Sequence, residues 1–108
     1  MLVHTILDVT NEAGTGGAYT GATLKTRMYR DETGIAQCTG YSGSGTVIIE
    51  GRLAPDAPWE SVMGDADPSG GFTSDDVKLS ILIMPEMRAS ASGISAFDTL
   101  TAKIHLME

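Results

Sequence analysis

The chain has 108 residues, which is room for one hydrophobic core, so we expect a single domain spanning residues 1–108. Its formal net charge of −7 argues against direct binding of nucleic acid, because an acidic surface repels phosphate groups. Cys38 is the only cysteine, which excludes an intrachain disulfide, and we interpret it as a small, half-buried strand residue. The N-terminal apolar run ends after about nine residues, short of the ~20 that span a bilayer, and no basic region of a signal peptide precedes it.

Strands are predicted along the whole chain, because apolar residues recur mostly at every second position. In chain order, the expected strands cover residues 3–9, 22–30, 35–40, 47–53, 58–63, 77–84, 87–95 and 99–106. Glycine clusters and prolines separate them, and no window keeps a helical period over three turns. The predicted fold is all-β: one small antiparallel β-sandwich or jelly-roll-like barrel of about seven to eight strands.

Several strands carry apolar residues on both faces, although a sheet with one solvated face should be polar on that side. Three strands have an expected core face: Val3, Leu7 and Val9 in the first, Val47, Ile49 and Leu53 in the second, and Val77, Leu79, Ile81 and Ile83 in the third. The surplus apolar residues on the opposite faces are Leu2, Ile6, Ile48, Leu82 and Met84. Either the long glycine-rich loops cover them, or they are buried against another subunit, as exposed apolar patches often are.

The segment from Asp65 to Asp76 has the spacing of a calcium-binding loop. Asp65, Asp67 and Ser69 occupy loop positions one, three and five, a glycine follows at six, and Asp76 occupies position twelve. The aspartate at position twelve is shorter than the usual glutamate, a proline interrupts the loop, and no flanking helices are expected. A solvated acidic loop is therefore the alternative interpretation.

No catalytic constellation is found, so we expect no enzyme activity and no cofactor other than this calcium. The segment 40–44, Gly-Tyr-Ser-Gly-Ser, lacks the final glycine of a nucleophile elbow and its α/β context. His4 and His105 lie at opposite ends of the chain and are interpreted as outward strand positions. The glycine clusters lack the spacing of phosphate-binding loops.

Trp59 follows the corner at residues 54–58, Ala-Pro-Asp-Ala-Pro, and two hypotheses compete for it. It plugs one end of the sandwich, or it joins the tyrosines in a platform on which a sugar stacks. For Arg88 we expect a carboxylate partner, inside the fold or at an interface.

The chain resembles small β-sandwich virion proteins of tailed bacteriophages in three places. These are the strand at 45–53, the corner ending at Trp59, and the segment 84–88, which leads to a threonine-rich final strand. Within that group, the chain is similar to capsid decoration (cement) proteins, which implies a structural protein on the outer capsid, made in the host cytoplasm. The implied partners are the major capsid protein and copies of the chain itself, as a homotrimer, with no nucleic acid and no membrane. The alternatives are a phage tail or neck component, or a carbohydrate- or calcium-binding β-sandwich module.

Overall fold

The fold was analysed in a computed structural model that describes residues 2–9, 17–26, 33–43, 45–63, 71–95 and 98–106, with the backbone alone for residues 2 and 78–80. The described part of the chain is built from strands and contains no α-helix. The strands are β1 (Leu2–Asp8), β2 (Gly17–Thr20), β3 (Leu24–Lys25), β4 (Thr33–Ser42), β5 (Thr46–Arg52), β6 (Glu60–Ser61), β7 (Asp76–Leu82), β8 (Glu86–Ile94) and β9 (Thr99–Leu106). The all-β prediction is confirmed.

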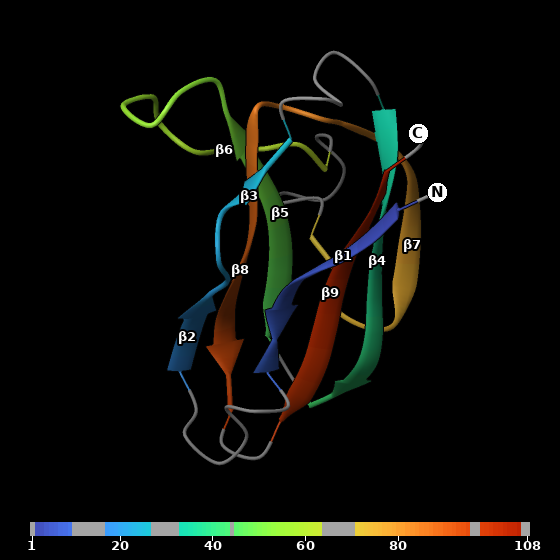
Figure 1. The fold of residues 1–108 in the computed structure, drawn as a ribbon. Helices are drawn as coiled ribbons and strands as arrows, with labels where there is room; N and C mark the ends of the chain where they lie inside the picture. The colour runs from blue at the N-terminus through green and yellow to red at the C-terminus, as the bar shows by residue number, and fades with distance from the viewer. Residues whose placement is uncertain are drawn as a thin grey trace.

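The strands form two antiparallel sheets that pack face to face (Figure 1). Sheet A has four strands in the order β1-β9-β4-β7. Sheet B has five strands: β2-β8-β5-β6 in order, with β3 also paired to β8. The first and last strands of the chain lie side by side in sheet A, which ties the two ends of the described chain together. The architecture is a small β-sandwich.

The core lies between the sheets and follows the predicted alternation most closely in β5 and β9. In β9, every second residue from Leu100 to Leu106 is buried, while the residues between them are half-buried on the outer side. In β5, Val47 and Ile49 are fully buried. β-Branched and leucine side chains at period two therefore fill the interior, as a sandwich requires.

Two β-bulges change which side chains face the core. In β1, Ile6 is the extra residue between Thr5 and Leu7, which pair with consecutive residues of β9, and both Ile6 and Leu7 are buried. Val3 lies outward and is 52% exposed. The prediction that Ile6 faces outward and Val3 inward was therefore wrong, because the extra residue of a bulge shifts the alternation.

The second bulge lies in the pairing of β7 with β4, where Gly34 pairs with Ile81 but Ala36 pairs with Lys78. Ile81 and Ile83 are buried as predicted, whereas Val77 lies outward and is 41% exposed. The predicted common face of Val77 and Ile81 is interrupted by this bulge.

Gly21 lies where the connection between β2 and β3 passes close to β1 of sheet A. Its N–H donates to the carbonyl of Ala89 at 2.9 Å, which anchors it to β8. A Cβ atom at this position would lie 1.6 Å from the carbonyl oxygen of Ile6 in β1. Only glycine lets the connection between β2 and β3 pass this close to sheet A.

Candidate functional site

The residues of the predicted calcium loop are only partly described. Asp65, Asp67 and Ser69 lie outside the described residues. Asp76 begins β7, is exposed, and its Oδ1 accepts a hydrogen bond from the N–H of Val77 at 2.8 Å. No three histidine, cysteine, aspartate or glutamate side chains come together as a metal site within the described ranges. Calcium binding stays a prediction.

The five predicted interface residues have different surroundings. Leu82 is 54% exposed on the outer side of sheet A, and Ile6 is buried in the core and cannot reach a partner. Met84 is half-buried and packs against the core. Ile48 is half-buried on the outer side of sheet B, beside Gly71, where a Cβ would lie 3.1 Å from its Cγ1. For Leu2 the backbone alone is described.

The outer side of sheet A, called here the sheet A face, carries an unusual number of uncovered apolar side chains. Val3, Val77 and Leu82 are exposed, and Ile35 of β4 is half-exposed between them. Strand register places Val3, His105 and Ile35 in one row across the sheet. A second row holds Thr5, Lys103, Gln37 and Val77, and Leu82 pairs with Thr33 beyond the first row.

The polar groups in the middle of the sheet A face bond to one another. The ring Nε2 of His105 lies 2.8 Å from Oε1 of Gln37. Threonines make up most of the remaining positions: Thr5, Thr33, Thr39, Thr99 and Thr101. Among its described side chains, Asp8 and Lys103 are the only aspartate, glutamate, lysine or arginine residues, and their charges offset each other, on a chain of net charge −7.

The outer side of sheet B is different, because it carries a network of two ion pairs and the tryptophan. Arg52 Nη2 lies 2.7 Å from Glu86 Oε1, and Arg88 Nε lies 2.9 Å from Glu50 Oε1. Each pair joins residues directly opposite each other on β5 and β8. The carboxylate partner expected for Arg88 is thus Glu50.

Trp59 lies over both arginines of this network. The guanidinium carbons of Arg52 and Arg88 are 4.4 Å and 4.2 Å from its ring centroid, within cation–π range. The ring is half-buried on the outer side of sheet B, so the prediction that it plugs one end of the sandwich was wrong. The chain's own guanidinium groups therefore engage the ring, and the sugar-stacking platform stays a prediction.

Trp59 and the prolines hold the loop of residues 53–59, which extends from sheet B on the side away from sheet A (Figure 1, upper left). The N–H of Ala57 donates to the carbonyl of Ala54 at 3.0 Å, and Pro55 and Pro58 restrict the backbone on either side of this turn. Leu53, predicted to belong to the core, is 71% exposed at the start of this loop. Pro55, two residues after Leu53, cannot donate a hydrogen bond to a neighbouring strand. It therefore indicates that the strand ends near Leu53, before this side chain is directed into the core.

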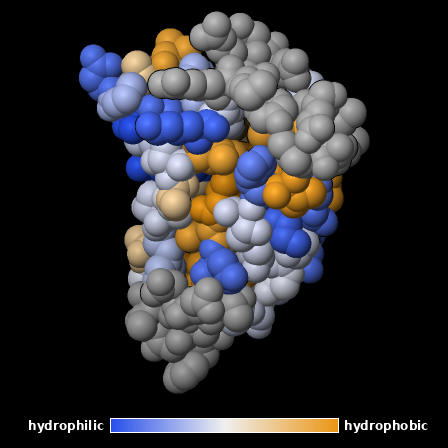
Figure 2. Space-filling model, in the orientation of Figure 1, coloured by the Kyte–Doolittle hydropathy of each residue, from blue (hydrophilic) through white to orange (hydrophobic). Residues whose placement is uncertain are grey.

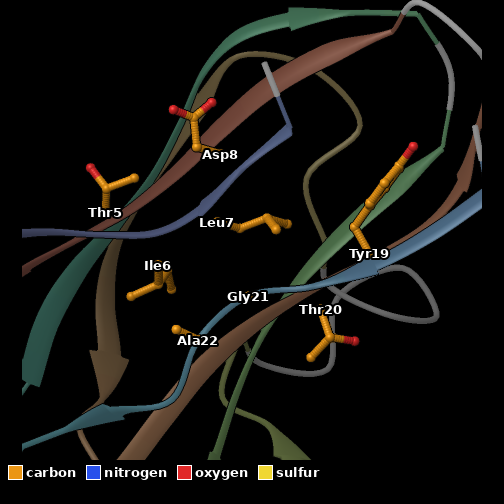
Figure 3. Close-up of a pocket in the computed structure, with 8 residues that line it drawn as sticks. All are labelled: Thr5, Ile6, Leu7, Asp8, Tyr19, Thr20, Gly21 and Ala22. Carbon is orange, nitrogen blue, oxygen red and sulfur yellow. The ribbon is translucent and has the colours of Figure 1, made fainter. Parts of the chain in front are cut away.

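A shallow groove of about 290 Å³ runs along the side of the sandwich where β1 faces the segment from β2 to Ala22. Figure 2 shows apolar residues exposed in a strip between the two sheets on this side of the molecule. Figure 3 shows Ile6 and Leu7 directed toward Gly21 and Ala22, with Asp8 on the opposite side of β1. The lining residues are Thr5, Ile6, Leu7, Asp8, Tyr19, Thr20, Gly21 and Ala22. Asp8 points away from the groove and no lysine, arginine or histidine lines it, so the groove offers no nucleophile–base pair.

The remaining reactive groups lie in the interior. Burial raises the pKa of the Cys38 thiol from 9.0 to about 11, and the negative charge of Asp75 adds to the rise. Burial also raises the pKa of Tyr41, whose hydroxyl donates to the carbonyl of Gly45 at 2.5 Å. His4 is directed inward, against the prediction, and its Nε2 is buried with no hydrogen-bond partner among the described residues.

Comparison of the chain with protein-family models, with curated protein sequences and with solved structures finds no match. In the described ranges, no helix has the length and apolar character that crossing a bilayer demands. The candidate functional sites are therefore defined by the geometry above: the sheet A face, the loop of residues 53–59, and the groove between β1 and β2.

Proposed function

We propose that this chain is a structural protein of a tailed-phage virion, in the role of a capsid decoration protein that binds the outside of the shell. The observation that carries the proposal is the presence of large uncovered apolar side chains at two separate places on one rigid sandwich. One place is Leu53 on the loop of residues 53–59, and the other is the sheet A face. A protein that links neighbouring subunits needs at least two such contact surfaces, because it has to bind its target and its neighbours together.

In this proposal the loop of residues 53–59 contacts the major capsid protein. Leu53 is the most exposed large apolar side chain among the described residues, and the turn at Ala57 and the stacking of Trp59 fix the loop beneath it. A loop that is ordered before binding loses little conformational entropy when it binds. The free energy gained by burying its leucine therefore adds more to affinity than it would on a loop that becomes ordered only on binding. The mechanism is burial of apolar area on the shell, without chemical turnover, and it stabilises the assembled form by mass action.

The resemblance of the segments at 45–59 and 84–88 to small virion proteins supports the same role. The acidic surface is compatible with a position on the outside of the shell, away from the packaged nucleic acid. The proposed partners are the major capsid protein and copies of the chain itself, and the function requires no cofactor.

The test is to purify phage particles from the culture that yields this chain and to quantify it by mass spectrometry against the major capsid protein. We expect on the order of hundreds of copies per particle, as the multivalent coating of a shell requires. A few copies per particle would transfer the chain to the tail or neck, and its absence from particles would overturn the proposal.

A binding experiment locates the contact. Particles stripped of the chain are incubated with the purified protein or with Leu53→Glu, and the bound fraction is measured after sedimentation. We expect Leu53→Glu to bind at least about tenfold more weakly, because a carboxylate replaces the buried leucine. Asp56→Asn, a change in the same loop that leaves Leu53 in place, is the matched control and should bind like the original chain.

A further inference from the structure

We infer that the sheet A face is the surface on which a second copy of this chain docks, sheet against sheet, to form a symmetric dimer. This inference replaces the homotrimer that the resemblance implies by a dimer, and it rests on the proposed function for its purpose, since a coating protein needs contacts between its own copies. The evidence for the occupant is in the charge, the polar pairing and the area of the face.

Charge favours a second copy at this surface. The chain carries 14 acidic and 7 basic residues, so two copies repel each other over most of their surfaces. Among the described side chains of the sheet A face, Asp8 and Lys103 are the only aspartate, glutamate, lysine or arginine residues, and their charges offset each other. This face can therefore meet its own copy with few acidic groups brought together, and it offers a strongly charged partner little to bind.

The polar side chains on the face are suited to burial. Nε2 of His105 and Oε1 of Gln37 lie 2.8 Å apart near its centre, so this hydrogen bond can persist when water is removed there. Val3 and Val77 lie on the two edge strands, β1 and β7, and Leu82 lies at the end of β7. Apolar groups at both edges and a bonded polar pair in the middle form an arrangement that a two-fold rotation can match to itself.

The area is sufficient for a reversible dimer. Four strands about 4.8 Å apart and about seven residues long give a face of roughly 19 by 23 Å, or about 440 Å² on each copy. Two stacked copies then bury about 900 Å² of plan area, and the relief of the side chains raises the accessible area above that value. This lies at the low end for specific interfaces, so we expect a dissociation constant in the micromolar range.

The experiment is sedimentation velocity of the purified chain between about 1 µM and about 1 mM, with three variants. We expect a monomer–dimer equilibrium in the original chain. Leu82→Glu and Val77→Glu should raise the dimer dissociation constant at least about tenfold, because each buries a carboxylate in the stacked face. Leu53→Glu is the matched control: it makes the same kind of change at a more exposed position away from the face and should leave the dimer unchanged. Circular dichroism spectra and melting curves confirm that each variant is folded.

Salt gives an independent readout. Raising the salt concentration screens the repulsion between two acidic copies, so the dimer should become tighter, whereas an interface held by ion pairs would weaken. A chain that stays monomeric over the whole range, a trimer, or a dimer lost in Leu53→Glu but kept in Leu82→Glu would each overturn the inference.

The sedimentation experiment and the count of copies in particles together separate this inference from the proposed function. A chain that dimerises through the sheet A face but does not occur in particles would contradict the virion role and leave the dimer standing. A chain that coats particles yet stays monomeric would do the reverse.

Discussion

The outer sides of the two sheets are both formed by antiparallel strands, but they carry different side chains. On sheet B, Glu50 and Arg88 pair across the strands, Arg52 and Glu86 do the same, and Trp59 lies over both arginines. On sheet A, the corresponding surface has uncovered valine, isoleucine and leucine side chains and one polar pair. One surface is completed by the chain's own residues, and the other keeps uncovered apolar side chains.

This difference shows where the chain's stability and its interactions are located. Removing one partner of a cross-strand ion pair that is partly shielded from water destabilises the fold, because it leaves the other charge without its counter-charge. An exposed leucine on a sheet contributes almost nothing to the fold of a monomer, since it is solvated before and after folding. Changes on sheet B should therefore alter stability, whereas changes on sheet A should alter association.

The largest effect is expected for Glu86→Gln. Glu86 is buried and its Oε1 accepts from Nε and Nη2 of Arg52 at 2.9 Å and 2.7 Å. The glutamine keeps the shape but leaves the guanidinium without its counter-charge, so we expect a loss of about 3 kcal/mol in the free energy of unfolding, measured by urea denaturation.

Glu60→Gln is the control for that measurement. Glu60 lies in β6 of the same sheet and is exposed, and the described residues include no ion pair for it. The same chemical change should cost less than about 0.5 kcal/mol there. Equal losses in the two variants would show that the sheet B network does not stabilise the fold and would remove the contrast between the two surfaces.

The second effect concerns the inner side of sheet A, where Cys38 is buried in the core. The folded chain holds the thiol of Cys38 protonated up to about pH 11, whereas the unfolded chain releases the proton near pH 9.0. The thiol's contribution is therefore fully present below pH 9 and is lost as the pH rises through 11, a total of about 2–3 kcal/mol. Urea midpoints at pH 8 and at pH 11 measure this loss.

Cys38→Ala isolates the thiol from the tyrosines and lysines that titrate in the same range. The variant is less stable at pH 8, because a buried sulfur is replaced by a smaller group, but its alkaline loss should be smaller than that of the original chain by the amount given above. Parallel losses in both proteins would contradict the assignment to Cys38.

The smallest effect is expected on the sheet A face itself. Leu82→Thr replaces an exposed leucine by the residue type that dominates this surface, and in dilute solution we expect a change in unfolding free energy within about 0.5 kcal/mol. The same urea denaturation experiment, at a concentration where the chain is monomeric, checks it. A loss as large as that of Glu86→Gln would mean that Leu82 is part of the monomer's core.

The sequence was sufficient to predict an all-β fold, with a sandwich and a barrel both left open, because period-two alternation in β5 and β9 matches the buried positions directly. It was insufficient at β1 and β7, since a bulge depends on how a strand pairs with its neighbour and leaves no mark in the period of the strand itself. Ile6 was therefore taken for a surface residue, and Val3 and Val77 for core residues.

The polar network was also partly foreseeable. A carboxylate partner was expected for Arg88, but Glu50 became identifiable only through the antiparallel register that sets the two residues opposite each other. The place of Trp59 depends on the same register, because it brings Arg52 and Arg88 close enough to share one ring.

Trp59 is the only tryptophan of the chain, and its place over two guanidinium groups gives the protein a built-in optical reporter. Its fluorescence responds to the polarity and charge around a single indole, so a spectral change reports on the loop of residues 53–59 and on the ion pairs of sheet B that Trp59 contacts. Attachment of this loop to a surface should alter the emission, whereas pairing through sheet A should leave it unchanged. The two contacts can therefore be followed separately in the unlabelled protein, in real time and in one cuvette.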